Sequence, residues 1–263
     1  MQKRSPMEED QERNRRAWNA TSDAYQGLHL AQLTASPTAW GVWSLPETQV
    51  GLLGDVRGRD VLEYGCGGAQ WSIALAKLGA RCTGLDFSER QLEHAARAIR
   101  VAGVDVRLVH APAEATPFDD ASFDVVFCDH GAMSFAAPET TIPEVARTLR
   151  PGGILAFSVE HPLHALAWDD ATNAASLVLH RPYFGLGRFE DSEDGSVSHT
   201  RPVSTYVELL LANGFHVERL LEPQPAPDAA TSYEGFVGHA WARDFPAELM
   251  IRARLSHDTT SPF

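Results

Sequence analysis

A glycine-rich turn between two apolar segments constrains the fold of this chain more than any other stretch. The turn, Gly-Cys-Gly-Gly at 65–68, follows a short apolar run at 60–64 and precedes residues 69–78, whose apolar side chains recur at helical spacing. This order predicts a strand, a tight turn and a helix, the local shape of a nucleotide-binding crossover unit. Gly65 and Gly67 permit positive φ and the close approach of a ligand, toward which the helix directs unpaired N–H groups.

Two acidic residues accompany the turn. Glu63 precedes the first glycine, and Asp86 ends the next apolar run about 20 residues farther on. A carboxylate at Asp86 suits a ribose, because its two oxygens can accept hydrogen bonds from both hydroxyls of the diol. The structural alternatives are an ion pair for Glu63 and, for Asp86, a helix-start acid favoured by the helix dipole. As a dinucleotide fingerprint the turn is incomplete, since Gln70 stands where the third glycine belongs.

The pattern Glu-x-Gly-x-Gly, followed by an acid at the end of the second strand, resembles the class I S-adenosylmethionine-dependent methyltransferases. The family usually has a third glycine where this chain has Ala69. Three further segments resemble later motifs of the family, at 86–88, 111–124 and 149–153. The resemblance is strong over residues 56–160 and weaker over two segments nearer the C-terminus.

The resemblance implies that the chain binds S-adenosyl-L-methionine, with S-adenosyl-L-homocysteine as the product. In the family, an acid at the Asp86 position holds the ribose, and the next apolar side chain, here Phe87, touches the adenine. Residues at the positions of Ala113 and Glu114 approach the adenine ring, although a solvated loop acid is an equal alternative for Glu114. The candidate cofactor-binding residues are Tyr25, Glu63, Gly65, Cys66, Gly67, Gln70, Trp71, Asp86, Phe87, Gln91, Ala113, Glu114, Asp129 and His130.

Composition limits the classes of binding partner and the cellular compartment that we expect for this chain. A formal net charge of −13 argues against a nucleic-acid partner, because phosphate contacts need clustered Lys and Arg. Three widely spaced cysteines, Cys66, Cys82 and Cys128, favour buried free thiols in a reducing cytosol. No signal-peptide core is present and no run approaches about 18 apolar residues, so we expect a cytoplasmic protein with no membrane partner.

From residue 60 onward, strand patterns alternate with helix patterns, which is typical of a parallel sheet. Strands are predicted at 60–64, 81–86, 105–109, 123–128, 154–159, 215–221 and 249–255, and helices at 69–78, 88–101, 138–149 and 203–213. Ser88 and Gln91 form a capping-box pattern. The resemblance implies an α/β fold, a Rossmann-like, doubly wound sheet of seven strands, mostly parallel with an antiparallel C-terminal strand and helices on both faces. We expect one methyltransferase domain over 1–263.

The N-terminal segment is a candidate lid over the site. Residues 8–33 are predicted to form one or two helices, interrupted near 20–23. This helix either packs on the domain edge or belongs to a lid at 1–55; for the lid, the resemblance implies that the Tyr25 hydroxyl reaches the carboxylate of the cofactor. The apolar anchors of the segment are Trp18, Tyr25 and Leu28.

A second candidate cover lies after the fifth strand. Residues 160–200 break the alternation of strands and helices, and a loop this long is usually functional. We therefore interpret 160–202 as a substrate-cover insertion. Trp40 and Trp43, in an aromatic loop nearer the N-terminus, are either core residues or part of the substrate pocket.

Two histidines are candidate general bases. Ligands of open α/β sheets bind at the carboxyl ends of the strands, where His130 follows the fourth strand and His161 the fifth. His130 is the first choice and His161 the second, since an unperturbed imidazole titrates near pH 6.5. A loop histidine that hydrogen-bonds for shape is the alternative for either. No metal is expected, because no acid or cysteine spacing supports a site built from His161, His164 and His199.

The main functional hypothesis is methyl transfer from S-adenosylmethionine to a small-molecule acceptor by in-line displacement. In such a reaction, proximity and orientation supply much of the effect, and a base adds roughly 10²–10⁴-fold for a hydroxyl or a protonated amine. The aromatic residues of the two covers suggest an apolar or aromatic metabolite. We expect a monomer or a homodimer.

Three alternatives remain open at the level of sequence. A nicotinamide-dependent oxidoreductase is disfavoured by Gln70 and by the expected antiparallel end of the sheet. A protein or nucleic-acid methyltransferase is another, although the acidity disfavours nucleic acid and no Asn-Pro-Pro-Tyr-like motif follows the fourth strand. From a different class, the chain could be a non-catalytic S-adenosylmethionine-binding partner subunit.

Overall fold

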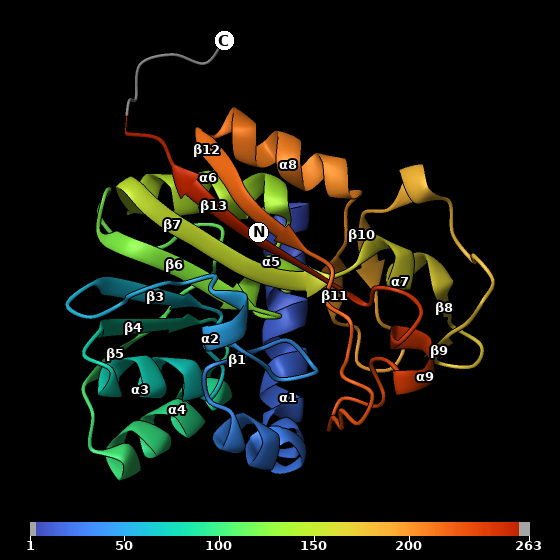
Figure 1. Cartoon of the computed structure of the whole chain (residues 1–263), viewed down its shortest axis with the longest axis horizontal. Coiled ribbons are helices and arrows are strands. Elements are labelled where there is room, and N and C mark those ends of the chain that lie inside the picture. Colours follow the sequence, from blue (N-terminus) through green and yellow to red (C-terminus); the bar gives the residue numbers. More distant parts are fainter. Residues whose placement is uncertain (1–3, 258–263) are drawn as a thin grey trace.

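The computed structural model describes residues 4–257, in which one large sheet forms the centre of the molecule. Its strands are β3 (Asp60–Tyr64), β4 (Arg81–Asp86), β5 (Val106–His110), β6 (Phe123–Asp129), β7 (Leu149–Glu160), β12 (Phe215–Leu221) and β13 (Glu248–Leu255). Their order is β12-β13-β7-β6-β3-β4-β5 (Figure 1). Neighbouring strands are parallel, except that β13 runs antiparallel to both β12 and β7. The predicted seven-stranded sheet with one antiparallel C-terminal strand is confirmed.

Helices cover both faces of this sheet, as the resemblance implied. They are α3 (Gln70–Lys77), α4 (Glu89–Ala102), α5 (Ala132–Phe135), α6 (Pro138–Thr148) and α8 (Val203–Ala212). On β6, Val126 and Cys128 pack in one cluster with α5, α6 and α8, whereas Val125 and Phe127 pack in another with α3. Successive side chains of a strand point to opposite faces, so a strand covered on both faces is apolar throughout.

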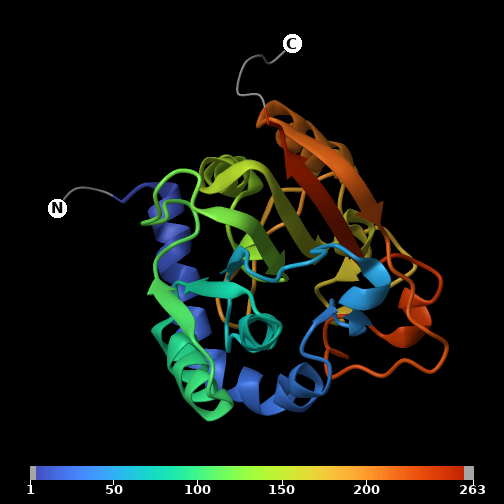
Figure 2. The same cartoon turned by 60° about the vertical axis from the view of Figure 1, so that its left-hand side comes forward.

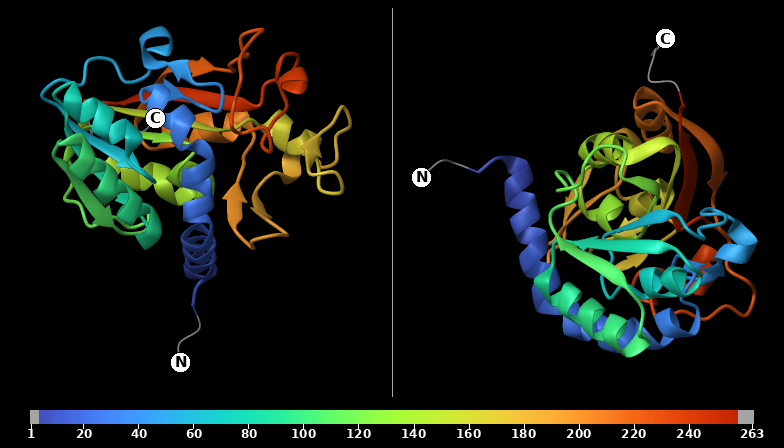
Figure 3. Two further views of the ribbon diagram at one scale, coloured as in Figure 1. Left: turned by 90° about the horizontal axis from the view of Figure 1, so that it is seen from below. Right: turned by 90° about the vertical axis from the view of Figure 1, so that its left-hand side faces the viewer.

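One long helix, α1 (Pro6–Ala35), occupies most of the N-terminal segment. It begins with a capping box, in which the Glu8 amide donates to the Ser5 hydroxyl and the Ser5 amide donates to the Glu8 carboxylate. Figures 2 and 3 show α1 running beside α4 at the edge of the molecule. It therefore reaches from the β5 edge of the sheet toward the C-terminal segments.

Two details of the predicted N-terminal helix are wrong. The interruption near 20–23 does not occur: Thr21 and Ser22 stay helical, and their hydroxyls donate to carbonyls four residues earlier within the helix. Leu28, predicted as an apolar anchor, is 65% exposed. The sequence of residues 1 to about 6 predicts disorder; residues 1–3 lie outside the described residues, whereas Ser5 is the N-cap of α1, which begins at Pro6.

The predicted loop at 160–200 contains short elements. These are α7 (Pro162–Ala167), β8 (Trp168–Asp169), β9 (Ala174–Ala175), the 3-10 turn η1 (Tyr183–Gly185), β10 (Arg188–Glu190) and β11 (Val197–His199). β8 pairs with β9 and β10 with β11, each antiparallel. Local pairing of this kind has little periodicity in sequence, which is why the segment reads as a loop. It extends from the carboxyl end of β7 (Figure 1).

Four smaller elements complete the fold. Near the N-terminus, β1 (Ala39–Trp40) pairs with β2 (Leu45–Pro46), and α2 (Glu47–Val50) follows; α9 (His239–Ala242) precedes β13. Trp40 is a core residue, fully buried with its ring 5.1 Å from that of Trp71. Trp43 packs in a separate small cluster with residues of the α9 segment.

Two predictions concern the state of the cysteines and the presence of membrane-spanning helices. Cys66, Cys82 and Cys128 are buried and free, as predicted, and burial raises the pKa of each thiol. Across residues 4–257, every helix is too short or too polar to span a bilayer.

Candidate functional site

The glycine turn packs against the turn that follows β6. Gly65 has φ +86°, and a Cβ atom there would overlap the backbone nitrogen of Ala132, the first residue of α5. A Cβ atom on Gly131 would in turn overlap the carbonyl oxygen of Gly65. The amides of Gly65 and Cys66 both donate to the carbonyl of Leu85 at 2.9 Å. Glycine at 65 is therefore required by the approach of two backbone segments as well as by its φ angle.

Asp86 ends β4 beside this turn, with its carboxylate oriented by two backbone amides. The Gly67 amide donates to Oδ2 and the Ser88 amide to Oδ1, both at 2.8 Å. Burial raises the pKa of Asp86 to about 6, against the lowering effect of these hydrogen bonds. Asp86 thus joins the turn to the start of α4 at the carboxyl edge of the sheet, where α/β folds bind ligands.

The backbone of Ala69 has a conformation that favours glycine, the residue that the family pattern has at this position. It is the N-cap of α3 with φ +57° and ψ +30°, the left-handed region. An alanine pays about 1–2 kcal/mol for this conformation, and a glycine does not. The departure from the family pattern therefore preserves the shape of the turn at a modest energetic cost.

Glu63 is buried under the turn and bound to α3. Ser72 donates to its Oε2 from both the amide (2.9 Å) and the hydroxyl (2.5 Å). Burial raises the pKa of Glu63 to about 8, and the nearby carboxylates act in the same direction. Within residues 4–257 no basic side chain pairs with it, so the ion-pair alternative is wrong. Its contact with a cofactor stays a prediction.

Three glutamine side chains connect α1 to the glycine turn. Gln26 of α1 donates to Gln91 at 2.9 Å and accepts from Gln70 at 2.9 Å. The same amide lies so close to Gly68 that a Cβ atom there would be 2.9 Å from it. The predicted capping box at α4 is therefore only half formed: the Gln91 amide donates to the Ser88 hydroxyl, but the Gln91 side chain binds Gln26.

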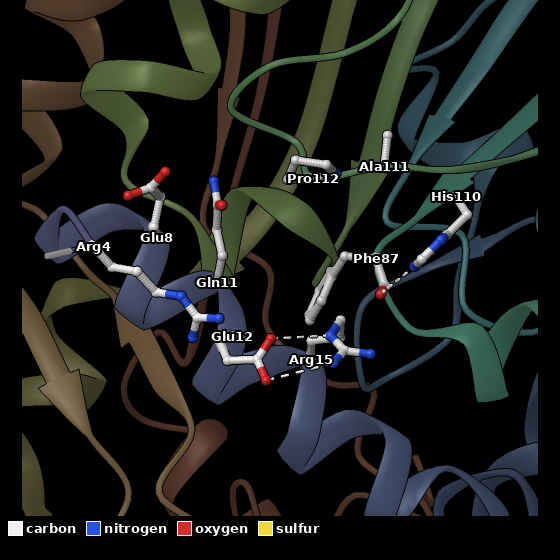
Figure 4. Close-up of a pocket in the computed structure, with 9 residues that line it drawn as sticks. All are labelled: Arg4, Glu8, Gln11, Glu12, Arg15, Phe87, His110, Ala111 and Pro112. Atoms are coloured by element: carbon white, nitrogen blue, oxygen red, sulfur yellow. Dashed lines mark hydrogen bonds and ion pairs between the residues drawn. The ribbon is translucent and has the colours of Figure 1, made fainter. Parts of the chain in front are cut away.

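A cleft of about 320 Å³ lies between the N-terminal part of α1 and the ends of β4 and β5 (Figure 4). Its lining residues are Arg4, Glu8, Gln11, Glu12, Arg15, Phe87, His110, Ala111 and Pro112. The apolar part comes from the strand ends and the charged part from the N-terminal segment. Phe87, the predicted adenine contact, therefore borders a cleft at the correct edge of the sheet.

Ala113 and Glu114 follow directly after this cleft. Ala113 is buried, and its carbonyl accepts a hydrogen bond from the Tyr64 hydroxyl. Glu114 is half-buried, and burial raises the pKa of its carboxyl group, which does not fit a solvated loop acid. Contacts of either residue with an adenine ring stay a prediction.

Asp129 collects donors from three segments at the end of β6. Its carboxylate accepts from the Gly41 amide at 3.0 Å, the Ser158 hydroxyl at 2.5 Å and the Trp71 indole at 3.3 Å. Burial raises the pKa of Asp129. The structure thus brings together two of the predicted residues, Trp71 and Asp129, beside the glycine turn.

His130 follows Asp129, and its imidazole pairs with a buried glutamate. Nε2 lies 2.7 Å from Oε1 of Glu248, which also accepts from the Val42 amide at 2.9 Å. Glu248 is 1% exposed, and within residues 4–257 its Oε2 has no hydrogen-bond partner. Burial of His130 disfavours the imidazolium, but the surrounding carboxylates, Glu248 first among them, outweigh it and raise the pKa of His130.

His161 has a structural role. It is the N-cap of α7, with Nδ1 accepting from the Leu163 amide at 3.0 Å and Nε2 lying 2.9 Å from Glu222 Oε1. Burial lowers the pKa of His161, which favours the neutral ring. Both ring nitrogens are engaged, so the geometry fits the histidine that hydrogen-bonds for shape.

Aromatic side chains from α1 pack against the segment before α9, which also carries a ring beside His130. The hydroxyls of Tyr25 and Tyr233 lie 3.0 Å apart, and the ring of His29 stacks on Tyr233 with centroids 3.9 Å apart. The Phe236 ring lies 5.6 Å from that of His130. Tyr25 thus packs against the segment before α9, and its reach to a cofactor carboxylate stays a prediction.

Three residues of this site were missed from the sequence: Gln26, Tyr233 and Glu248. A signal existed for Glu248, because the first residue of an antiparallel strand lies at the edge where its parallel neighbours end. For Gln26 and Tyr233 no local signal exists, since a polar helix residue and a loop aromatic are common everywhere. Across residues 4–257, no group of three His, Cys, Asp or Glu side chains is arranged to hold a metal ion.

Part of the chain is similar to known methyltransferases. Residues 62–157 match a family model described as a methyltransferase domain. A curated demethylmenaquinone methyltransferase of Clavibacter sepedonicus is 39% identical over 113 residues, which cover 43% of this chain and 44% of that protein. The chain spans about half the length of the curated relatives it matches.

Solved structures match over more of the chain. An S-adenosylmethionine-dependent methyltransferase from Mesorhizobium loti has a TM-score of 0.63 and 26% identity, covering 79% of this chain and 95% of that one. A Burkholderia thailandensis 1,6-didemethyltoxoflavin-N1-methyltransferase, solved with 1,6-didemethyltoxoflavin and S-adenosylhomocysteine, has a TM-score of 0.62 at 18% identity and covers 97% and 93%. At 18% identity, the match to the Burkholderia thailandensis enzyme shows a shared fold only. Together these matches confirm the resemblance and the predicted fold class.

Proposed function

We propose that this chain, in which residues 62–157 match a methyltransferase domain model, transfers a methyl group from S-adenosylmethionine to a small-molecule acceptor. The observation that carries the proposal is the 2.8 Å hydrogen bond from the Gly67 amide to the buried Asp86. It sets an acid beside a glycine turn at the carboxyl ends of β3 and β4, where folds of this class bind their ligands.

The residues around the turn fit S-adenosylmethionine. The two oxygens of Asp86 are oriented by backbone amides and would accept the ribose hydroxyls with their remaining lone pairs. Phe87 would face the adenine from the cleft of Figure 4. Asp129, which accepts from the indole of Trp71 just after the turn, would attract the ammonium group. The bound cofactor supplies a methyl group on a positively charged sulfur, which leaves as a neutral thioether.

His130 is the residue that would take a proton from the acceptor. Its pKa is raised by neighbouring carboxylates, which makes it a stronger base than an isolated imidazole. It lies one residue from Gly131, which packs on Gly65 of the glycine turn. His161 would not compete for this role, because the α7 cap and Glu222 occupy both of its ring nitrogens.

The acceptor proposed is an aromatic or otherwise apolar small molecule. Support comes from the ring of Phe236, which lies 5.6 Å from that of His130, and from the paired rings of Tyr25 and Tyr233. Curated relatives are named as methyltransferases of demethylmenaquinone, but the chain covers only part of their length. We propose α1 and the 160–202 segment as covers of the site, with α1 attached to the glycine turn through Gln26.

Isothermal calorimetry with S-adenosylhomocysteine tests the cofactor. We expect binding by the wild type, loss of at least about tenfold in affinity in Asp86→Ala, and wild-type affinity in Asp105→Ala, which removes an exposed aspartate before β5. Absence of binding, or a preference for NAD, would contradict the proposal. Methylation of a small-molecule panel by the isolated chain separates an enzyme from a non-catalytic partner subunit.

A further inference from the structure

We propose that Glu248 is the positioning residue for His130: it holds the neutral imidazole as the Nε2–H tautomer and leaves Nδ1 free to take a proton. This inference rests on the proposed function and deepens it. A base of this kind serves acceptors that carry a proton on the attacking atom, such as a hydroxyl, a thiol or a protonated amine.

The hydrogen-bond geometry determines the tautomer. An ionised carboxylate only accepts, so the 2.7 Å contact requires Nε2 of His130 to be the donor. Glu248 is itself held in place, because its Oε1 also accepts from the Val42 amide. Within residues 4–257, Nδ1 of His130 has no hydrogen-bond partner. The neutral ring therefore has its free lone pair on Nδ1. Glu248, the partner of Nε2, selects this Nε2–H tautomer.

Strand topology brings the two residues together. β13 is antiparallel to β7, so its first residue, Glu248, pairs with Glu160 at the end where the parallel strands finish. His130 leaves β6 at the same end, and its amide donates to the carbonyl of Ser158 at 3.2 Å. The pair is thus fixed by three adjacent strands of the central sheet, which is a rigid support for a proton-transfer group.

The state of Glu248 also points to a charge that becomes useful during turnover. Its side chain is 1% exposed, yet within the described residues Oε2 has no donor. A buried carboxylate oxygen without a partner is unfavourable, and such groups in native structures usually have a purpose. Stabilising an imidazolium that forms on His130 is such a purpose, because opposite charges at hydrogen-bond distance attract strongly in a buried site.

The other charged groups facing His130 are Asp129 on β6 and Glu160 on β7. Both are engaged elsewhere. Glu160 lies 2.7 Å from Nδ1 of His164 and accepts from the Thr200 hydroxyl, while Asp129 accepts from the donors described above. Among the described residues, only Glu248 forms a hydrogen bond with the His130 ring.

These positions define where each electron pair and the proton go during methyl transfer. The acceptor forms its new bond to the methyl carbon with its own lone pair, as the carbon–sulfur bonding pair stays with the sulfur. The proton lost by the acceptor passes to Nδ1 of His130, and the resulting imidazolium keeps its Nε2–H directed at Glu248.

Imidazole NMR on the full chain tests the pairing without an acceptor. With ¹⁵N-labelled protein and the His130 signals assigned from His130→Asn, we expect an Nε2–H tautomer in the neutral wild type. In Glu248→Gln the midpoint of the His130 titration falls by about one to three pH units, and the tautomer is no longer fixed. Glu222→Gln is the matched control: it removes the carboxylate paired with His161 and leaves the His130 signals unchanged.

An Nδ1–H tautomer in the wild type, or an unchanged midpoint in Glu248→Gln, would overturn the inference. If Glu248→Gln does not fold, Glu248→Asp shortens the side chain and keeps its charge; we then expect loss of the fixed tautomer. If the NMR results are as expected but S-adenosylhomocysteine does not bind, the proposed function is contradicted and the pairing of His130 with Glu248 still stands. Once a methyl acceptor is identified, we expect Glu248→Gln to lower kcat and to shift the acidic limb of the kcat–pH profile to lower pH, with little change in KM.

Discussion

The backbone of Gly65 packs against that of Ala132 so closely that a Cβ atom on Gly65 would overlap the Ala132 nitrogen. This contact joins the turn after β3 to the turn after β6. The first of these turns carries the amide that orients Asp86, and the second carries His130. The cofactor side and the proton-transfer side of the proposed site are therefore parts of one packed unit.

Gly65→Ala should damage both sides. The positive φ costs an alanine about 1–2 kcal/mol, and its Cβ atom must also push the two turns apart. We expect a larger fall in the free energy of unfolding than this φ cost and loss of S-adenosylhomocysteine binding. Gly58→Ala is the control, since Gly58 has φ +69° but open space around its Cβ position. Urea denaturation and calorimetry of both variants check this; equal effects would show that the overlap is unimportant.

Affinity for S-adenosylhomocysteine should fall as the pH drops through about 6. The raised pKa of Asp86 means that its carboxyl group is ionised above about pH 6 and protonated below it. A protonated carboxyl has a donor where the ribose diol also offers donors, so the protonated form binds more weakly. Calorimetry across this range in wild type and Asp86→Asn measures it. We expect weak binding by Asp86→Asn with a much smaller dependence on pH; a flat profile in the wild type would contradict the assignment.

Gln26→Ala should loosen the attachment of α1 to the glycine turn. It removes two side-chain hydrogen bonds, each with a net contribution of about 0.5–1.5 kcal/mol. We expect a lower free energy of unfolding and faster dissociation of S-adenosylhomocysteine, measured by urea denaturation and stopped-flow fluorescence. Leu28→Ala, on the same helix but exposed, should change neither quantity appreciably. Unchanged dissociation from Gln26→Ala would show that α1 is not a cover.

The two histidines first considered as bases should respond differently to the same substitution. With an identified acceptor that carries a proton, His130→Asn is expected to lower kcat by roughly 10²–10⁴-fold, the usual contribution of a positioned base. His161→Asn should retain most of the activity, because asparagine is also a good N-cap for α7. Steady-state kinetics of both variants distinguishes them; similar losses would argue against His130 as the base.

Several features of the site were correctly predicted from short stretches of sequence. The positions of β3, β4 and the glycine turn follow from apolar periodicity and from glycines that the backbone requires. Asp86 was recognisable because its distance from the turn reflects one strand–helix–strand unit. The continuity of α1 was missed, because the Thr21-Ser22 pair favours a break when its tertiary context is unknown.

By itself, the sequence determined the seven strands of the central sheet, the glycine turn and the acid at the end of β4, since these depend on residues close together in the chain. Only the tertiary structure decided which distant side chains complete the site. Glu248 lies 118 residues from His130 and reaches it because β13 inserts antiparallel between β12 and β7. Gln26 binds Gln91 across 65 residues because α1 packs on α4. Such contacts depend on how whole elements pack, and no local periodicity encodes them.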